Sequence, residues 1–346
     1  MNRGPLVSII VPCYNAARYI GALCASIQNQ TCEDFEALVL DDGSSDNSFE
    51  KANAFRSDSR FIIEQATPNR GVGTRTAELL RRARGEFWAY PGADDLIDPD
   101  FLAKRLEGFR ANPSASLIHG PARLIDSDGN PLPDSWDRFE HFLTIPPLAG
   151  GQRLIELLLE HNVLNTPSIL ARMEPTRRIL PKFDVRWQYA QDWCLWLLLA
   201  SLEMDFVYDG QVLNSYRLHP MSLSHIPEKA ARRAAELRLV PLTSLSAGQE
   251  LSLTARAAWN RWCRPLYALW LRRALQMNLK GQLEDEWLRL GVNALYGLTT
   301  AKPRLLKEIA LHAGDIVAAS LRDRRIRRGL SFPVSGLAEI NDPAFR

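Results

Sequence analysis

Two adjacent carboxylates, Asp94 and Asp95, follow a short apolar run in the segment WAYPGADDLIDPD, residues 88–100. Divalent ions such as Mg²⁺ and Mn²⁺ prefer oxygen ligands, and one or two carboxylates commonly bridge them to phosphate oxygens. The same residues are also typical of a polar turn before a helix, because Asp and Gly favour turns for conformational reasons. We therefore expect Asp94 to face a metal, and Asp98 to cap the helix that begins near Pro99.

Polar and aromatic residues also follow three other short apolar runs. Ligands of doubly wound α/β sheets bind beyond the carboxyl ends of the strands, so these residues are expected to meet at one rim. They are Tyr14 and Asn15 after the first run, Asp41 and Asp42 after the second, and Arg70 and Arg75 after the third. An aromatic face, acids, arginines and a carboxylate pair together suit a nucleoside diphosphate bound with a divalent metal.

The apolar runs themselves predict the elements that position this rim. Strands are expected at 6–11, 35–41, 61–65 and 86–90, where short runs are rich in β-branched or aromatic residues. Helix-length amphipathic segments lie between these runs. This alternation predicts an α/β fold with a mostly parallel central sheet flanked by helices.

Later segments follow a looser pattern. SLIHG and ARLID resemble strands joined by a tight turn, and DSDGN supplies hairpin chemistry. Residues 131–150 are expected to form a long loop and residues 151–161 a helix. A buried helix is predicted at 188–202, and strand-like alternation follows at 206–219.

Two common nucleotide-binding motifs are missing from the sequence. A dehydrogenase of the Rossmann type needs a glycine-rich turn after the first strand, and here that turn reads PCYNAARY, without glycine. The P-loop pattern GxxxxGK[ST] does not occur. A nucleotide would therefore be held by a different arrangement.

Charge divides the chain into two parts. Residues 1–225 contain 22 Lys and Arg against 29 Asp and Glu, whereas residues 226–346 contain 20 against 11. We expect a boundary near residue 226, between an acidic body and a basic, mostly helical C-terminal region at 226–346. The segment 256–275 mixes Trp, Leu and Arg, a composition typical of helices that lie in a membrane interface. An amphipathic helix packed on the acidic body would have the same composition.

Composition also bounds the cellular context. The five cysteines are scattered without a CxxC pair, which favours a reducing compartment over a disulfide framework or zinc cluster. We find neither a signal-peptide pattern nor an apolar run of about 18–20 residues. We expect a cytoplasmic protein that associates peripherally with the inner face of a membrane through its C-terminal helices, and no nucleic-acid partner.

Five segments resemble, in order and spacing, the motifs of family 2 inverting glycosyltransferases, which have the GT-A fold. They are VSIIVPCYNAARYI, LVLDDGSSDNS, NRGVGTR, ARGEFWAYPGADD and AQDWCLWLLLA…YRLHPMSLS. The resemblance covers residues 5–225. It implies transfer of a sugar from a nucleotide-diphosphate donor, expected to be a UDP-sugar, to a hydroxyl of a polysaccharide or lipid-linked saccharide.

The resemblance also implies roles for individual residues. Tyr14 would stack on the base, Asp192 would be the general base, and Asp94, the last acid of the DXD motif, would bind Mg²⁺ or Mn²⁺ together with His219. Arg217 and His219 would neighbour the diphosphate. The residues implied in nucleotide binding are Pro12, Tyr14, Asp41, Asp42, Arg75 and Ala93.

Two positions depart from the family's pattern. Gly92 stands where the first DXD acid is usual, and Gln191 stands where a glutamate usually precedes the base. Loss of one anionic oxygen is expected to weaken metal binding. These departures motivate an alternative, a nucleotide-sugar-binding subunit with impaired catalysis. A third hypothesis makes the basic tail an oligomer or membrane scaffold.

Overall fold

The computed structural model describes residues 4–132, 148–149, 154–155, 157–158 and 162–222, and the single positions 236, 240 and 244. The chain divides into two compact units, residues 1–264 and 265–346, and every described residue belongs to the first. Among the residues described, no helix is both long and apolar enough to cross a lipid bilayer.

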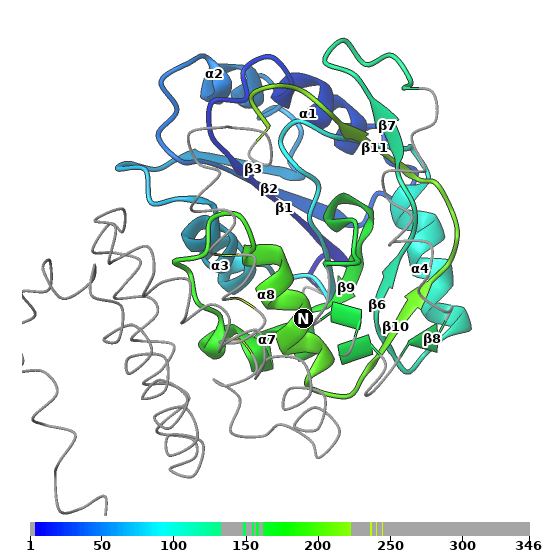
Figure 1. Ribbon diagram of the computed structural model, residues 1–346. Helices are drawn as coiled ribbons and strands as arrows, with labels where there is room; N and C mark the ends of the chain where they lie inside the picture. Colours follow the sequence, from blue (N-terminus) through cyan, green and yellow to red (C-terminus); the bar gives the residue numbers. More distant parts are fainter. Residues whose placement is uncertain are drawn as a thin grey trace, which may run out of the picture. The chain divides into compact units, whose positions relative to one another are not determined.

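A mostly parallel sheet forms the centre of the first unit (Figure 1). Its eight strands lie in the spatial order β3-β2-β1-β4-β9-β6-β10-β8, with β9 and β8 antiparallel to their neighbours. The strands are β1 (Val7–Cys13), β2 (Phe35–Asp41), β3 (Phe61–Gln65), β4 (Phe87–Ala89), β6 (Ala115–His119), β8 (Leu148–Ala149), β9 (Leu170–Arg172) and β10 (Asp205–Tyr208). The predicted fold class is confirmed for this part of the chain.

The first strands form where the apolar runs predicted them. Strands β2 and β3 have the predicted bounds, and β1 extends two residues further than expected, to Cys13. All seven residues of β2 are buried, as expected of a parallel strand that helices cover on both faces. Consecutive strands therefore deliver their following loops to one edge of the sheet.

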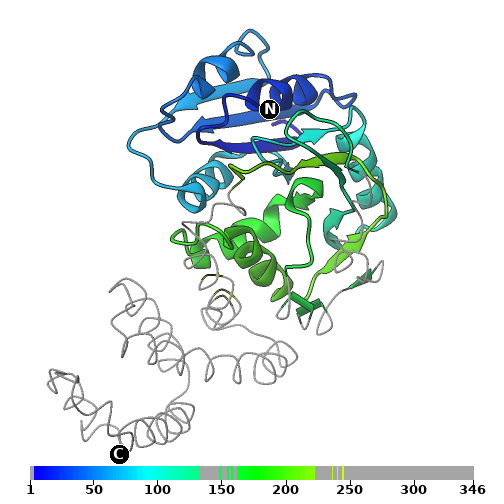
Figure 2. The ribbon, with the colours of Figure 1, turned by 45° about the horizontal axis from the view of Figure 1, so that its top comes forward.

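Helices cover both faces of this sheet (Figures 1 and 2). One face carries α1 (Ile20–Gln28), α2 (Ser48–Asn53) and α4 (Phe101–Ala111), and the other carries α3 (Val72–Arg82), α7 (Met173–Ile179) and α8 (Gln191–Ala200). Core residues such as Ile9, Leu23 and Phe101 pack together on the first face. On the second face, Trp88 of β4 stacks on Trp196 of α8, with ring centroids 6.1 Å apart. This contact holds α8 against β4, the strand that leads into the predicted metal turn.

A second sheet has three strands in the order β5-β11-β7: β5 (Leu96–Ile97), β11 (Asn214–Arg217) and β7 (Arg123–Ile125). Two strand predictions are wrong here. The expected hairpin between 116–120 and 122–126 does not form, since β6 joins the large sheet and β7 the small one. The expected strand at 206–219 is two strands, one in each sheet, because the chain turns at Gly210, whose φ is +69°.

The tight turn predicted at DSDGN does form. The N–H of Gly129 donates to the carbonyl of Asp126 (3.1 Å), and Ile125 bridges Pro131 in antiparallel fashion. The predicted cap at Asp98 is wrong. No side chain caps α4, which follows Asp100, and the Asp98 carboxylate instead accepts hydrogen bonds from both terminal nitrogens of Arg123 (3.1 and 3.0 Å).

Several predictions lie largely outside the described residues: the loop at 131–150, most of the helix at 151–161, and the C-terminal region beyond 226. Positions 154, 155, 157 and 158 are helical. Positions 236, 240 and 244 are helical and buried within the first unit. The boundary near 226 stays a prediction.

Candidate active site

The loop after β1 is tied to the loop after β2. Asn15 has a left-handed backbone (φ +50°), which allows its Oδ1 to accept the N–H of Ser45 (2.9 Å) while its own N–H donates to Ser44 Oγ (2.8 Å). Tyr14 lies beside this junction and is 52% exposed. An accessible aromatic ring on a fixed backbone is the arrangement that stacking on a nucleotide base requires.

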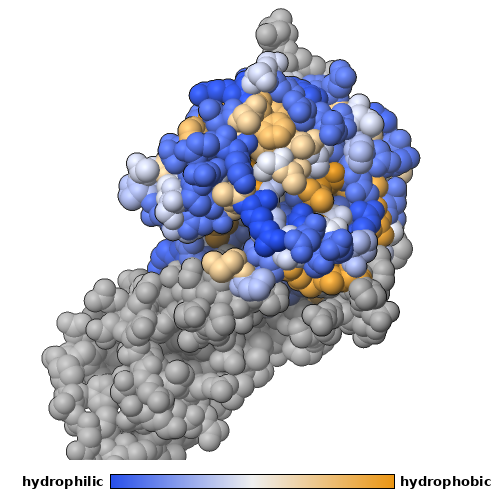
Figure 3. Space-filling model, turned by 90° about the horizontal axis from the view of Figure 1, so that it is seen from above, coloured by the Kyte–Doolittle hydropathy of each residue, from blue (hydrophilic) through white to orange (hydrophobic). Residues whose placement is uncertain are grey.

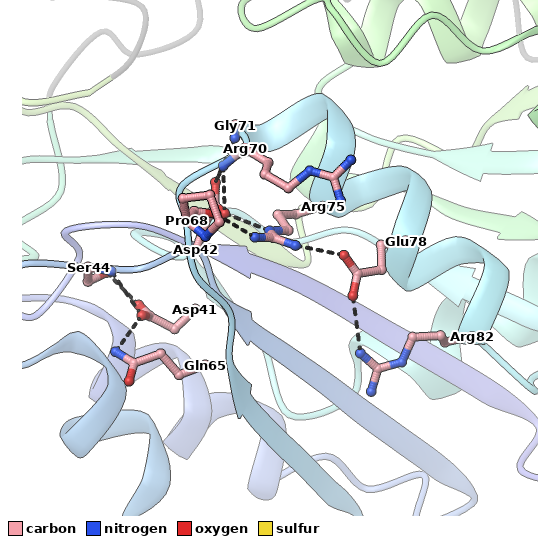
Figure 4. Close-up of polar contacts among 10 residues, drawn as sticks. All are labelled: Asp41, Asp42, Ser44, Gln65, Pro68, Arg70, Gly71, Arg75, Glu78 and Arg82. Carbon is pink, nitrogen blue, oxygen red and sulfur yellow. Dashed lines mark hydrogen bonds and ion pairs between the residues drawn. The ribbon is translucent and has the colours of Figure 1, made fainter.

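Asp41 holds the loop that follows β2 (Figure 4). Its buried carboxylate accepts the N–H of Ser44 (3.0 Å) and the side-chain amide of Gln65 (3.1 Å). Asp41 therefore joins the ends of β2 and β3, and through Ser44 it also supports the loop that carries Tyr14.

Asp42 connects β2 to the start of α3 (Figure 4). Its carboxylate accepts the backbone N–H groups of Arg70 (3.0 Å) and Gly71 (2.7 Å), and Nε of Arg75 lies 2.6 Å away. Asp42 and Arg75 are each 4% exposed, so the ion pair is shielded from solvent. Asp41, Asp42 and Arg75 thus gather at one edge, as predicted, and the structure gives all three a clear architectural role.

Asp94 and His219 meet just beyond β4, although 125 positions separate them. Oδ2 of Asp94 lies 2.9 Å from Nε2 of His219. The His219 ring lies against Tyr19, with centroids 4.6 Å apart, and the Arg217 guanidinium lies 4.9 Å from the same Tyr19 ring. Arg217 Nε also donates to the carbonyl of Asp94 (2.7 Å). The Asp94 carboxylate, the His219 imidazole and the Arg217 guanidinium therefore lie close together at the rim.

Asp95 braces this turn from inside. Its carboxylate accepts the backbone N–H groups of Arg217 (2.9 Å) and Gly92 (3.2 Å). Burial and the neighbouring Asp94 charge raise the pKa of Asp95 well above the usual range. A Cβ placed on Gly92 would lie 2.5 Å from Asp95 Oδ2 and 2.8 Å from Asp94 Oδ1. Asp95 therefore occupies the space that a side chain at position 92 would need.

Asp94 and His219 are the side chains at this turn that could hold a divalent ion. Over the part of the chain that the structure describes, no group of three or more His, Cys, Asp or Glu residues is arranged to hold a metal. Two protein ligands nevertheless fit Mg²⁺ or Mn²⁺, because Mg²⁺ commonly binds one or two carboxylates and completes its shell with water and substrate phosphates. The donor set suits an ion that is shared with a diphosphate.

Asp192 lies in the first turn of α8 and is partly buried. Its Oδ1 accepts the N–H of Trp193 (2.7 Å), and its Oδ2 accepts hydrogen bonds from Thr166 Oγ1 (2.6 Å) and Asn162 Nδ2 (3.3 Å). Burial of the carboxylate raises the pKa of Asp192 above its ordinary value, although the Thr166 hydrogen bond opposes the rise. The carboxylate is consequently fixed in orientation and more basic than an exposed aspartate.

Gln191 ties the start of α8 to the end of β4. Its Nε2 donates to the hydroxyl of Tyr90 (2.9 Å), which also lies 2.8 Å from Thr76 Oγ1 of α3. Burial raises the pKa of Tyr90, and the charge of Asp192 adds to the rise. Tyr90 precedes Asp94 by four positions. The helix that carries Asp192 is thus bonded to the residue that follows β4, four positions before Asp94.

The remaining predicted residues, Pro12 and Ala93, are partly buried at the ends of β1 and β4. Sequence reasoning missed the side chains that hold the predicted ones: Thr166, Asn162, Tyr90, Tyr19 and Ser44. Tyr19, Ser44 and Tyr90 lie inside the motifs quoted above, but those motifs do not predict the contacts that these side chains make. Thr166 and Asn162 lie outside the motifs and contact Asp192 from 26 and 30 positions away.

The face of the molecule shown in Figure 3 is mostly hydrophilic, with hydrophobic residues gathered near its centre. Within the described residues, the exposed large hydrophobic side chains are Tyr14 (52%) and Met221 (74%). Tyr14 follows β1, and Met221 lies two positions after His219. Accessible apolar side chains therefore belong to the same loops as the candidate site.

Comparison with known proteins finds similarity to glycosyltransferases. The model of a protein family described as "Glycosyl transferase family 2" matches residues 8–161. A chondroitin synthase of Escherichia coli is 32% identical over 165 residues, which are 47% of this chain and 22% of that protein. The chain therefore spans about a fifth of that synthase. The glucosyltransferase WfgD of E. coli is 27% identical over 230 residues, 66% of this chain and 83% of that protein.

Solved structures show the same fold. TarS of S. aureus, residues 1–349 in complex with UDP-GlcNAc, has a TM-score of 0.57 at 19% identity, covering 86% of this chain and 82% of that one. The mannosyltransferase PcManGT of Pyrobaculum calidifontis, in complex with GDP-Man and Mn²⁺, has a TM-score of 0.52 at 18% identity, covering 87% of each chain. The fold is thus that of GT-A glycosyltransferases, and residues 8–161 of this chain are similar to glycosyl transferase family 2.

Proposed function

We propose that this protein is an inverting glycosyltransferase that moves a sugar from a nucleotide-diphosphate donor, a UDP-sugar, to a hydroxyl of a polysaccharide or lipid-linked saccharide. One observation carries the proposal. The Asp94–His219 pair and the helix of Asp192 are both anchored at the end of β4, the latter through the Gln191–Tyr90 hydrogen bond (2.9 Å). This shared attachment supports a diphosphate site and a general base that act on the same sugar.

The donor would bind across the rim described above. Tyr14 offers an exposed ring to the base, and the Asp42–Arg75 pair shapes the adjoining wall. Asp94 and His219 would hold a divalent ion against the diphosphate, where it would stabilise the negative charge that develops on the leaving group. Arg217 lies beside both of these residues, so it adds positive potential at the same place.

The transfer is a single displacement. The acceptor hydroxyl oxygen forms a bond to the anomeric carbon, and its proton passes to Asp192, the general base. The bond between that carbon and the diphosphate oxygen breaks, and the nucleoside diphosphate leaves with the electron pair. Attack opposite the leaving group inverts the anomeric configuration. Thr166 and Asn162 fix the orientation of Asp192, so that one carboxylate edge is set before the acceptor arrives.

The relatives guide the choice of substrates. WfgD is named a UDP-Glc:alpha-D-GlcNAc-diphosphoundecaprenol glucosyltransferase, and the TarS structure contains UDP-GlcNAc. We therefore propose a UDP-sugar donor and an envelope saccharide or lipid-linked acceptor. A lipid-linked acceptor would require peripheral contact with the inner face of a membrane. Flotation of the full chain with anionic and neutral vesicles tests this, and absence from both floating fractions counts against it.

Asp192→Asn is the direct test of the mechanism. The variant keeps the shape of the side chain but cannot accept the acceptor's proton, so we expect transfer to fall about 10²- to 10⁴-fold. UDP affinity measured by calorimetry with Mn²⁺ should stay within about threefold of the wild type. Full activity of the variant would remove Asp192 from the role of base.

A second candidate is a nucleotide-sugar-binding subunit with impaired catalysis. Gly92 and Gln191 favour it, because both replace acids of the family's pattern. Calorimetry with UDP and Mn²⁺, combined with a turnover assay over a panel of nucleotide sugars and acceptors, separates the two functions. Turnover by the isolated chain rules out the binding-only role, whereas tight UDP binding without turnover supports it.

A further inference from the structure

A buried carboxylate from outside the family match contacts the segment that leads to the proposed base. Glu236 is 1% exposed and helical. Its Oε2 accepts the backbone N–H groups of three consecutive residues, Gln188 (2.8 Å), Tyr189 (2.6 Å) and Ala190 (3.3 Å). Hydrogen bonds to an ionised acceptor are stronger than neutral ones, and successive N–H groups form a concavity that favours an anion.

The contacted segment lies between the two halves of the proposed site. It ends at Ala190, immediately before α8, so that Asp192 follows two positions later. At its other end the Gln188 side chain lies against Gly71, where an added Cβ would be 2.2 Å from Gln188 Oε1. The N–H of Gly71 in turn donates to Asp42. Residues 188–190 therefore connect the wall of the nucleotide site to the base.

The same C-terminal segment also contacts the body of α8. Val240 and Ser244 follow Glu236 at intervals of four, which places three helical positions on one face. Both residues are buried, and Ser244 Oγ lies 3.2 Å from Sγ of Cys194. Cys194 is two positions beyond Asp192. This face therefore contacts α8 after the proposed base, and Glu236 contacts the backbone before it.

We propose that Glu236 is a positioning residue for sugar transfer, which fixes the backbone of residues 188–190 and thereby places Asp192 relative to the donor. The inference rests on the proposed function. Glu236 bonds backbone groups, so its effect reaches the reaction through Asp192. Misplacement of a catalytic group by about 1 Å can cost roughly 100-fold in rate, whereas the nucleotide site keeps its own supports at Asp41 and Asp42.

The test compares Glu236→Ala and Glu236→Gln in the full chain. Glu236→Ala removes the acceptor, and we expect kcat per UDP-binding site to fall roughly 10- to 100-fold, with donor KM within about threefold of the wild type. Glu236→Gln keeps a carbonyl oxygen in the same place and should recover most of the lost rate. Counting sites by UDP calorimetry restricts the comparison to folded molecules, so that a loss of folded protein does not lower the measured kcat.

Hydrogen exchange supplies a readout that does not depend on activity. In Glu236→Ala the amides of residues 188–190 should exchange at least tenfold faster, while amides of β1 and β2 keep their wild-type rates. Two controls isolate the contact: Ser244→Ala alters the same helical face, and Glu174→Gln neutralises an exposed acid on α7. Both should retain the wild-type kcat and exchange at 188–190.

Two results would overturn the inference. One is an unchanged kcat per site in Glu236→Ala, and the other is exchange that accelerates equally across the whole unit, which would indicate a general role in stability. A wild-type chain that binds UDP but transfers no sugar defeats the proposed function instead. In that case the exchange rates at 188–190 decide whether Glu236 fixes this backbone.

Discussion

Gly92 illustrates how neighbouring atoms set the meaning of a single residue. The family's pattern places an acid at this position, and its absence suggests a weaker metal site. The structure shows that Asp95 fills the adjoining space, with Oδ2 only 2.5 Å from the position of an added Cβ. Asp95 also accepts hydrogen bonds from the backbone of Arg217 and Gly92. The absence of a side chain at Gly92 therefore makes room for the carboxylate that holds this turn together.

Gly92→Ala should therefore be costly although it adds a single methyl group. Overpacking a well-filled site typically costs about 1–3 kcal/mol, and the shift of Asp95 should also weaken Mn²⁺-dependent UDP binding. Gly21→Ala is the matched control, since no atom lies within 4 Å of its added Cβ and alanine favours the surrounding helix. Urea denaturation measures both variants, and equal free energies of unfolding would contradict this account of the turn.

Gln191 offers a test of the pKa of the proposed base. Burial raises the pKa of Asp192, and a base acts only when it is ionised, so activity should be lost as the pH falls through this raised pKa. Gln191→Glu would place a second negative charge beside Asp192 and raise its pKa further. We expect the acidic limb of the pH profile of kcat to move to higher pH.

Gln191→Met is the control for this shift. It removes the hydrogen bond to Tyr90 without adding charge, so it should lower the rate and leave the acidic limb where it is in the wild type. An acidic limb at the same pH in Gln191→Glu and the wild type would show that Asp192 does not set the profile.

Among the elements, β2 and α3 depend on one buried ion pair. Asp42 closes the end of β2 and accepts hydrogen bonds from the residues that start α3, and Arg75 returns from the first turn of that helix to pair with it. The helix begins after Gly71, whose φ of +83° suits glycine. The pair thus fixes the angle at which the chain leaves the strand.

Asp42→Asn should release this junction. Removing one partner of a buried ion pair typically costs roughly 3–5 kcal/mol. Glu78, which is 35% exposed and lies 2.8 Å from Arg75, offsets part of the lost charge, so we expect the lower end of this range. UDP affinity should fall as well, because the wall of the site moves. Glu64→Gln is the control, since its pair with Arg82 is 46% and 34% exposed and should contribute about 1 kcal/mol or less. Similar losses of stability in both variants would contradict a special role for Asp42.

For the molecule as a whole, the proposal requires that UDP and a divalent ion bind the folded state together. A ligand at 100 times its Kd adds about 2.7 kcal/mol of stability, which for a domain of this size raises Tm by roughly 5–10 °C. We expect this shift with UDP and Mn²⁺, and a much smaller one after chelation with EDTA. An EDTA-treated protein with the full shift would argue against a metal on the diphosphate.

The amino-acid sequence was sufficient to predict the parallel strands and the loops that follow them. Apolar β-branched runs form β1, β2 and β3 close to their predicted bounds, because burial on both faces leaves a pattern that can be read locally. The sequence also indicated that acids, arginines and Tyr14 would lie at one edge, since the carboxyl ends of parallel strands point the same way.

The later strands and the supports of the site could not be predicted in this way. Whether β7 pairs with β6 or with β11, and whether Asp98 caps a helix or pairs with Arg123, depends on competition between partners distant in sequence. The bonds of Asp192 to Thr166 and Asn162, and of residues 188–190 to Glu236, arise in the same way. A periodic pattern records which face of a segment is buried; the partner on that face is fixed when the whole chain packs.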